Sequence, residues 1–214
     1  MHAQPVNREN PTVNRTTFAL VAVAIAAALP HPAQAELRTA IFAGGCFWCM
    51  ESDFESVDGV VDVVSGYTGG SLTNPTYRNH EGHVEAVRIS YDDTKVTYEQ
   101  LLHTFWRVVD PTDAGGQFCD RGHSYTTAIF ALDAGQKQAA EASKAEIGAS
   151  DRLGAPVVTP VLDAGLFTEA EDYHQDYYRK NPVRYSFYRR GCGRDARIRA
   201  LWGAEAHAGV AHKG

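Results

Sequence analysis

Two cysteines separated by two aromatic residues are the part of this chain best suited to chemistry. Cys46 follows a pair of glycines, and Phe47 and Trp48 separate it from Cys49. A cysteine in the first turn of a helix lies beside unpaired N–H groups and the positive end of the helix dipole, and both lower the pKa of its thiol. We therefore expect Cys46 to be an accessible, ionised nucleophile, with the two aromatic side chains forming an apolar wall for a small group such as a methyl.

The other two cysteines, Cys119 and Cys192, bring the count to four. A chain of this length buries enough apolar surface to fold without disulfides, so its thiols are candidates for redox chemistry as well as for structural bridges. Four cysteines can form two disulfides in three ways, and the sequence alone does not choose among them.

Patterns of apolar residues predict the elements that position these cysteines. The first strand leads through the glycine pair into a helix, which places Cys46 at a helix start. Two capping boxes, Thr97 with Gln100 and Thr168 with Glu171, predict the starts of two later helices, and Asn181-Pro182 is expected to stop the second. The predicted elements are strand 37–43, helix 47–57, strand 60–66, strand 84–89, helix 97–109, strand 125–132, helix 134–149, strand 157–163 and a tyrosine-rich helix from 168 to 180.

This order of elements predicts an α+β fold. We expect a two-layer sandwich with a mixed sheet, a ferredoxin-like split βαβ core and a long irregular C-terminal segment. Two polar loops, 66–83 and 112–124, interrupt the periodic segments. Loops of this length frequently carry functional residues.

The N-terminal residues have the pattern of a secretory signal. Arg8 and Arg15 precede an apolar run over 18–29, and Ala33-Gln34-Ala35 is typical of a cleavage site. The run is shorter than the roughly 20 residues that span a membrane. We expect cleavage after Ala35 and export to the periplasm or beyond, with an uncleaved anchor as the alternative.

Cleavage would leave a single catalytic domain over 36–214. Removal of the first 35 residues changes the formal net charge from −6 to −7. A negative balance argues against a nucleic-acid partner, which favours a basic face. We expect a monomer without stable membrane association.

Several separated blocks point to a family when they are taken in order. They are Gly45-Cys46-Phe47-Trp48-Cys49-Met50-Glu51, Gly66-Tyr67-Thr68-Gly69-Gly70, Asn74-Pro75-Thr76-Tyr77, Gly82-His83-Val84-Glu85-Ala86-Val87, Asp120-Arg121-Gly122 before Tyr125, and Asp172-Tyr173-His174-Gln175. Together they resemble the peptide methionine sulfoxide reductase A family over about residues 38 to 203. Several blocks in register are far more specific than one cysteine-centred string.

The resemblance implies a division of labour in the site. Cys46 would attack the sulfur of methionine sulfoxide, while Glu85 with Tyr77 and Tyr125 would bind its oxygen. Reduction needs a proton donor at that oxygen, and burial can raise a glutamate pKa from about 4.3 by two or more units, which would keep it protonated. The resemblance also implies that Asp120 lies beside the pocket and supports Cys46 or an ordered water.

The resemblance further implies that oxidised Cys46, a sulfenic acid, condenses with a second thiol to form a disulfide. Many family members carry this resolving cysteine in a Gly-rich C-terminal segment, which Cys192 fits, although Arg184-Tyr185-Ser186 occupies the more familiar position. Two alternatives remain open: Cys49, one helical turn from Cys46, and Cys119, which could pair with Cys192 and relay the disulfide outward.

The activity implied is that of a peptide-methionine (S)-S-oxide reductase acting on oxidised proteins, peptides and free methionine sulfoxide. The resemblance implies no metal and no organic cofactor. Reducing equivalents would come from a thioredoxin-like protein, which for an exported enzyme must itself lie outside the cytoplasm.

Two other functions are compatible with the cysteine spacing. A general disulfide oxidoreductase would use the Cys-x-x-Cys pair itself, although it gives no role to the aromatic residues or to Glu85. A structural zinc domain would combine Cys46 and Cys49 with His80 and His83, although the two pairs are about thirty residues apart, longer than the usual finger spacing.

Overall fold

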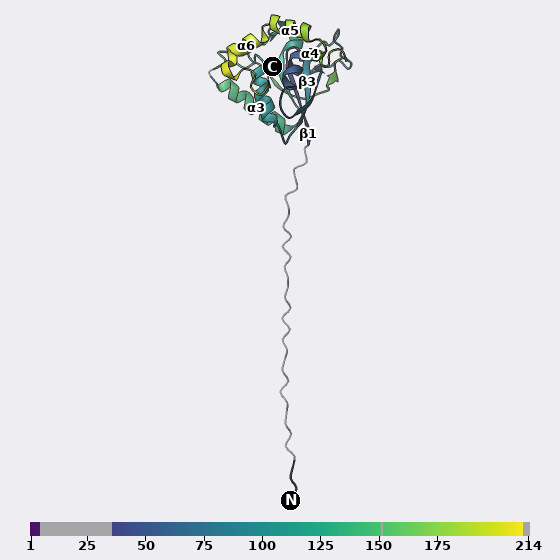
Figure 1. Cartoon of the computed structure of the whole chain (residues 1–214), viewed down its shortest axis with the longest axis vertical. Helices are drawn as coiled ribbons and strands as arrows, with labels where there is room; N and C mark the ends of the chain where they lie inside the picture. Colours follow the sequence, from purple (N-terminus) through teal and green to yellow (C-terminus); the bar gives the residue numbers. More distant parts are fainter. Residues whose placement is uncertain (5–35, 151, 212–214) are drawn as a thin grey trace. The chain divides into compact units, whose positions relative to one another are not determined.

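A six-stranded mixed sheet forms the centre of the fold (Figure 1). The computed structural model describes residues 1–4, 36–150 and 152–211. The sheet consists of β1 (Leu37–Gly44), β2 (Val60–Thr68), β3 (Val84–Asp92), β6 (Thr127–Ala131), β7 (Val161–Asp163) and β8 (Thr168–Glu169). In space the order is β7-β6-β1-β3-β2-β8; β6 and β7 are parallel, and all other neighbours are antiparallel.

Helices connect the central strands across the sheet. Helix α1 (Phe47–Phe54) joins β1 to β2, and α2 (Tyr98–Val108) begins the connection from β3 to β6. The strands joined in this way are not adjacent, because β3 lies between β1 and β2, and β1 lies between β3 and β6. These connections are those of a split βαβ arrangement, and the predicted α+β class with a mixed sheet is confirmed.

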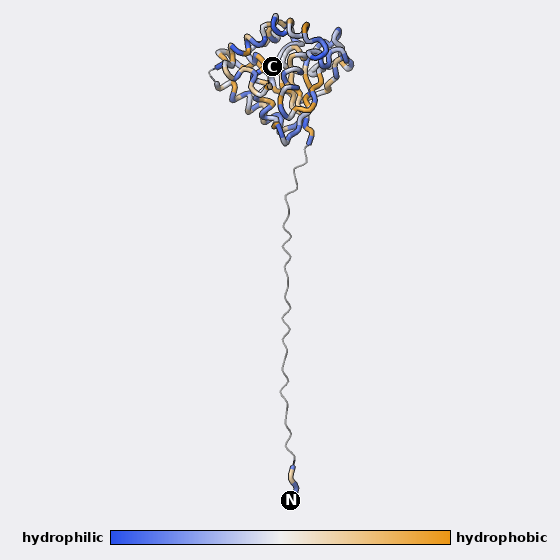
Figure 2. Tube along the Cα trace, viewed as in Figure 1, coloured by the Kyte–Doolittle hydropathy of each residue, from blue (hydrophilic) through white to orange (hydrophobic). Residues whose placement is uncertain are grey.

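The two faces of the sheet are covered differently. One face packs against α1, α2 and α3 (Ala134–Ala149) in the larger apolar core, which includes Phe42, Ile89 and Trp106. The opposite face carries a smaller cluster, with Ala164 and Phe167 from connecting segments packed on it. Hydrophilic segments run along much of the outside of this unit in Figure 2.

Local sequence signals account for the starts of α2 and α3. The predicted capping box is present: Gln100 N–H donates to Thr97 Oγ1 at 3.3 Å, and Thr97 N–H donates to Gln100 Oε1 at 2.8 Å. Asp133 Oδ1 accepts from Gln136 N–H at 2.8 Å and caps α3. Each cap satisfies N–H groups that have no partner within the helix.

The second capping box was predicted wrongly. Thr168 and Glu169 form β8, which pairs with Gly66 and Tyr67 of β2. The Glu171 carboxylate accepts hydrogen bonds from the Tyr67 hydroxyl and the Tyr77 N–H instead of capping a helix. Partners about 100 residues away in the sequence therefore override the local signal at this segment.

The expected long irregular C-terminal segment is also a wrong prediction. The chain forms α4 (Tyr177–Lys180), α5 (Pro182–Gly191) and α6 (Arg194–Trp202), which gather at the top of the view in Figure 1. Asn181 ends α4 as expected, but Pro182 occupies the first position of α5, where its missing N–H costs nothing. Burial of Tyr185 and Ile198 stabilises α5 and α6, whose sequences carry a weak apolar pattern of their own.

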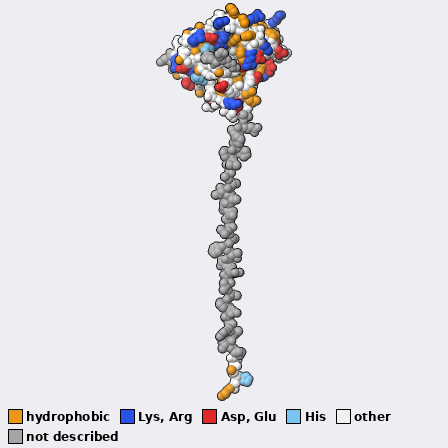
Figure 3. Space-filling model, viewed as in Figure 1, with side chains coloured by type: hydrophobic (Ala, Val, Ile, Leu, Met, Phe, Trp, Pro, Cys, Tyr) orange, Lys and Arg blue, Asp and Glu red, His pale blue; other side chains and the backbone are white. Residues whose placement is uncertain are grey.

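The predicted signal over residues 1–35 lies outside the described residues, apart from its first four. Among the residues that the structure describes, none of the helices is long and apolar enough to span a membrane. On the face of the molecule drawn in Figure 3, cationic and anionic side chains are interspersed among hydrophobic ones.

Candidate active site

Cys46 lies at the junction of β1 and α1, where it is the N-cap residue of the helix. The preceding Gly45 has φ of +81°, and a Cβ at this position would lie 2.5 Å from the Cβ of Gln117. Only glycine combines this backbone conformation with such a close approach. Cys46 is just 5% exposed, so the expectation of an accessible side chain after the glycine pair was wrong.

The expected lowering of the Cys46 pKa is also wrong for this state of the protein. Burial raises the pKa of the Cys46 thiol, and the neighbouring Cys49 raises it further. The first N–H of α1, on Phe47, donates to Glu85 Oε2 at 3.0 Å and is therefore not available to a Cys46 thiolate. The helix start that favours negative charge is thus occupied by a carboxyl group from β3.

Cys49 is the immediate partner of Cys46. The two side chains are hydrogen-bonded and lie in one buried cluster with Tyr185. The hydrogen bond from Cys46 lowers the pKa of Cys49 to about 7, and the positive charges of Arg194 and Arg189 act in the same direction. The pair therefore favours a thiolate on Cys49 that accepts the Cys46 proton as a hydrogen bond.

Burial favours the protonated form of the Glu85 carboxyl group. The side chain is 1% exposed, and burial raises its pKa to about 8, although the hydrogen bond from Phe47 N–H opposes the rise. The physical expectation from the sequence, a glutamate made neutral by burial, is met. At neutral pH this carboxylic acid can donate a proton in a largely apolar site.

Tyr77 and Tyr125 come from separate loops and meet through a side-chain hydrogen bond. Tyr77 N–H donates to Glu171 Oε1 at 3.0 Å, which anchors the long loop that carries it. Burial raises the pKa of both hydroxyls, and Glu85 adds to each rise. The structure therefore brings the three predicted oxygen-binding groups together as neutral donors near Cys46.

The two aromatic residues after Cys46 have different environments. Phe47 is 1% exposed and packs in the main core, whereas Trp48 is half-buried. Trp48 stacks on Tyr177 with ring centroids 3.7 Å apart, and its Nε1–H donates to His174 Nδ1 at 3.0 Å. Of the predicted apolar wall, Trp48 is the accessible part, and Tyr177 and His174 hold its ring in place.

Tyr188 is a site residue that the sequence analysis missed. Its hydroxyl is hydrogen-bonded with the Cys46 thiol and donates to Asp120 Oδ2. A single hydroxyl proton can serve only one acceptor at a time, so the Cys46 thiol and the Asp120 carboxylate share this donor. An Arg-Tyr-rich helix offers no local signal for such a role, because the contact joins α5 to residues more than 60 positions away.

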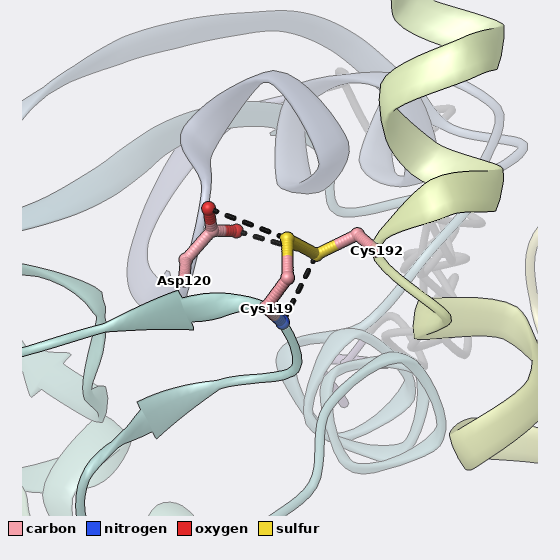
Figure 4. Close-up of side chains that lie close together, drawn as sticks. All are labelled: Cys119, Asp120 and Cys192. Carbon is pink, nitrogen blue, oxygen red and sulfur yellow. Dashed lines mark hydrogen bonds between the residues drawn. A yellow bond between two sulfur atoms is a disulfide. The ribbon is translucent and has the colours of Figure 1, made fainter.

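Asp120 and the other two cysteines form a group at the edge of this site (Figure 4). Cys119 and Cys192 are joined by a disulfide with an S–S distance of 2.07 Å, and their Cα atoms are 4.8 Å apart. Cys119 lies between β4 (Gly116–Gln117) and β5 (Asp120–Arg121), and Cys192 caps the C-terminus of α5. The pairing is the one considered from the sequence for an outward relay, whereas Cys46 and Cys49 are free thiols.

The Asp120 carboxylate contacts the disulfide directly. Its oxygens lie 3.7 Å from Cys119 Sγ and from Cys192 Sγ, and disulfide sulfurs have no proton to donate, so these are contacts and not hydrogen bonds. Burial raises the pKa of Asp120. Asp120 was predicted to lie beside the pocket. It contacts both Tyr188 and the disulfide, and Tyr188 in turn contacts Cys46.

Arg194 supports the turn before Cys46 and was also missed from the sequence. It is 1% exposed, and Nη2 donates to the carbonyl oxygens of Gly44 and Val108, both at 3.0 Å. Its guanidinium group lies over the Phe118 ring at 4.7 Å. A single cation thus links the end of β1, the end of α2 and the segment before Cys119.

Replacing Arg194 with alanine is expected to destabilise the fold by about 3 kcal/mol, because it leaves two buried carbonyls without their donor and opens a cavity. Urea unfolding followed by circular dichroism measures the change. The exposed Arg199 on the same helix is the control, and Arg199→Ala is expected to stay within about 0.5 kcal/mol of the parent. Equal stability of the two variants would contradict the supporting role.

The histidines of the alternative zinc site have other partners. His83 ring nitrogens are bonded to Gly70 N–H and to the Leu72 carbonyl oxygen, and His80 Nδ1 is bonded to the Thr76 carbonyl oxygen. His80 also stacks on Tyr67. These contacts assign both histidines to the organisation of the 66–83 loop.

Comparison with known proteins identifies the family of this chain. Residues 38–206 match the family described as peptide methionine sulfoxide reductase. The chain is 53% identical to the peptide methionine sulfoxide reductase MsrA 2 of Rhizobium meliloti over 83% of this chain and 90% of that protein, and 51% identical to the MsrA of Bacillus subtilis over 78% and 96%.

Solved structures show the same fold. Methionine sulfoxide reductase A of Corynebacterium diphtheriae superposes with a TM-score of 0.62 at 32% identity, covering 71% of this chain and 78% of that one. The reduced form of Mxr1 from Saccharomyces cerevisiae superposes with a TM-score of 0.64 at 27% identity, covering 69% and 87%. On its sequence and its fold, the chain belongs to the peptide methionine sulfoxide reductase family.

Proposed function

We propose that this protein is a peptide-methionine (S)-S-oxide reductase that repairs methionine S-sulfoxide in oxidised proteins, and also reduces the free compound. The observation that carries the proposal is the group of neutral donors beside a thiol: Glu85, Tyr77 and Tyr125 face the region of Cys46. A sulfoxide oxygen needs such donors, and an adjacent thiol can attack the sulfur.

The residues have distinct roles in this reaction. As Cys46 attacks the sulfoxide sulfur, its proton passes to the Cys49 thiolate, with which it is already hydrogen-bonded. Glu85 protonates the oxygen, while Tyr77 and Tyr125 hold it, and Trp48 contacts the methyl group. The products are methionine and a Cys46 sulfenic acid, so the thiol is oxidised as the sulfoxide is reduced.

A substrate assay tests both the epimer preference and the stoichiometry of the proposed reaction. Incubation of the reduced protein with R- and S-methionine sulfoxide should consume only the S epimer, with one sulfenic acid or disulfide formed per methionine released. Consumption of the R epimer at a comparable rate would contradict the proposal. The alternative oxidoreductase function predicts instead disulfide reduction in insulin without any need for sulfoxide.

We propose a thioredoxin-like protein as the electron donor, acting on the Cys119–Cys192 disulfide. Cys119 is exposed and Cys192 is partly exposed, whereas Cys46 and Cys49 are buried. A folded donor protein can therefore reach the Cys119–Cys192 disulfide, but it cannot reach Cys46 or Cys49. No metal or organic cofactor takes part in the proposed chemistry.

Cys192→Ser is expected to reduce thioredoxin-coupled turnover by at least about tenfold, because the disulfide that the donor attacks cannot form. Dithiothreitol is small enough to reduce oxidised Cys46 directly and should support turnover by the same variant. NADPH consumption with thioredoxin and thioredoxin reductase measures the first rate, and methionine release measures the second. Full coupled turnover by the variant would show that electrons enter elsewhere.

We also propose that residues 1–35 direct export and are removed, which leaves 36–214 as one catalytic domain with a ferredoxin-like core. The support is the signal pattern in the sequence and a family match that begins only at residue 38. N-terminal sequencing of the protein from cell fractions tests this proposal. A periplasmic or secreted form that begins at Glu36 is expected, and a monomer is expected on size-exclusion chromatography.

A further inference from the structure

We propose that Cys49 is the first thiol to resolve oxidised Cys46, so that oxidation passes through a Cys46–Cys49 disulfide before it reaches Cys119 and Cys192. This inference rests on the proposed function and adds an inner redox pair to it. The protein would then use two disulfides in succession, one buried at the site of oxygen transfer and one at the surface.

The geometry of α1 places the two inner sulfurs together. Cys46 is the N-cap of this helix and Cys49 is the third residue within it, so the two side chains lie within one turn of each other. Cys49 N–H donates to the Cys46 carbonyl oxygen at 3.1 Å, which closes the turn. Side chains three residues apart on a helix have Cβ atoms about 5 to 6 Å apart, and a disulfide needs about 3.5 to 4.5 Å, so the first turn of α1 must tighten slightly for the bond to form.

The side chains of Tyr188 and Asp120 form the chain of contacts between Cys46 and Cys192. The Tyr188 hydroxyl contacts the Cys46 thiol and donates to Asp120, and the Asp120 carboxylate in turn contacts the disulfide. Tyr188 and Cys192 are on the same helix, with Cys192 N–H bonded to the Tyr188 carbonyl oxygen at 2.8 Å. Direct attack by Cys192 on Cys46 would require Tyr188 to leave its position, whereas the Cys49 side chain is already hydrogen-bonded with Cys46.

Two nearby arginines also favour the thiolate form of Cys49, the form that attacks in this step. Arg189 is held by Asp53 at 2.7 Å and by Asp195 at 2.8 Å, and the buried Arg194 contacts Met50 Sδ of α1 at 3.2 Å. Both arginines lower the pKa of Cys49. A thiol with a pKa near ambient pH is the best attacking group in disulfide chemistry.

The proposed steps balance. After oxygen transfer, the Cys49 sulfur attacks the Cys46 sulfur, the S–OH bond breaks, and the hydroxyl leaves as water with the Cys49 proton. A reduced Cys119 and Cys192 pair then exchanges with the Cys46–Cys49 disulfide, which regenerates the two inner thiols and forms the Cys119–Cys192 disulfide. The external dithiol protein reduces this outer disulfide and is itself oxidised. The structure has the outer pair oxidised and the inner pair reduced, which is the state that this exchange would leave.

The test uses a variant that retains only the inner pair, Cys119→Ser/Cys192→Ser. The reduced, desalted protein receives one equivalent of methionine S-sulfoxide without reductant. We expect one methionine per protein, loss of both remaining thiols, a Cys46–Cys49 disulfide by peptide mapping, and almost no sulfenic acid trapped by dimedone. The matched variant with Cys49→Ser added should release methionine more slowly, because it lacks the thiolate that accepts the Cys46 proton. Its sulfenic acid should remain trappable at least about 100-fold longer, because it has no adjacent thiol to attack it.

The outcomes separate this inference from the function on which it rests. Methionine release with an intact Cys49 thiol and a persistent sulfenic acid in the inner-pair variant would overturn the inference alone. Absence of methionine from a folded inner-pair variant would overturn the proposed function, and the inference with it.

If loss of the outer disulfide unfolds the variant, a quenched time course on the reduced full chain replaces it. We then expect the Cys46–Cys49 peptide to appear before the Cys119–Cys192 peptide. A Cys46–Cys192 link that appears first, with Cys49 free throughout, would overturn the inference.

Discussion

Cys46→Ser is expected to reduce turnover of methionine sulfoxide by on the order of 10⁴-fold or more, whichever reductant is supplied. A serine hydroxyl in this buried position cannot form the sulfur–oxygen product, and Glu85 cannot replace a missing nucleophile. Methionine release is measured by amino-acid analysis, once with dithiothreitol and once with a thioredoxin system. The two assays should fail equally, because the lost step precedes every reduction step.

Folding must be separated from chemistry in this variant, because Cys46 is buried in a packed cluster. Serine is nearly isosteric, and thermal unfolding should shift by no more than a few degrees. Dimedone labelling in a Cys49→Ser background provides a second readout: it should label Cys46 during turnover and label nothing once Cys46→Ser is added. Turnover by Cys46→Ser within about tenfold of the parent rate would assign the nucleophile to another residue.

Glu85→Ala is expected to lower kcat/KM by about 10²- to 10³-fold, the effect of removing a proton donor from a developing charge. The loss of kcat/KM should exceed that of Tyr77→Phe or Tyr125→Phe, because each of these substitutions removes only one of the two tyrosine hydroxyls. Glu85→Gln retains a neutral donor without an ionisable proton and should retain more activity than the alanine variant. Equal kcat/KM values for the parent and Glu85→Ala would exclude Glu85 as the proton donor.

The pH dependence gives the same assignment a sharper test. Glu85 has its pKa raised to about 8, so the acid is in its donating form below that pH and is lost as the pH rises through it. We expect kcat/KM of the parent to fall on the alkaline side of about pH 8. On the acid side it should rise as Cys49, with its pKa lowered to about 7, ionises and can accept the Cys46 proton. Glu85→Gln should lack the alkaline fall and retain the acid-side rise. A parent profile that continues to rise above pH 9 would contradict the assignment.

Most of the fold could be predicted from local patterns. The short apolar runs of β1 and β3, the Thr97 capping box and the alanine-rich α3 all encode elements through neighbours within a few residues. The prediction failed at Thr168, where a correct capping pattern is used as an edge strand because β2 offers backbone partners. It also failed for α5 and α6, whose stability comes from burial against distant parts of the chain.

In the candidate site, too, some residues could be predicted from the sequence and others depend on distant contacts. Cys46, Glu85, Tyr77 and Tyr125 were named from sequence blocks, and the structure brings them together. Tyr188, His174 and Arg194 were assigned no role, because their contacts join residues 60 to 150 positions apart and leave no periodic or spacing signal.

Residue types and short-range order were sufficient to predict the α+β class and to mark Cys46 as a candidate nucleophile, and the family resemblance implied the oxygen-binding roles of Glu85, Tyr77 and Tyr125. Only the tertiary structure decided how Cys46 and Glu85 ionise. The Phe47 N–H at the start of α1 goes to Glu85, and burial makes that carboxyl neutral while it opposes charge on Cys46. Desolvation and hydrogen-bond competition depend on which groups meet in space, and for this reason the pKa values of a buried site cannot be obtained from spacing along the chain.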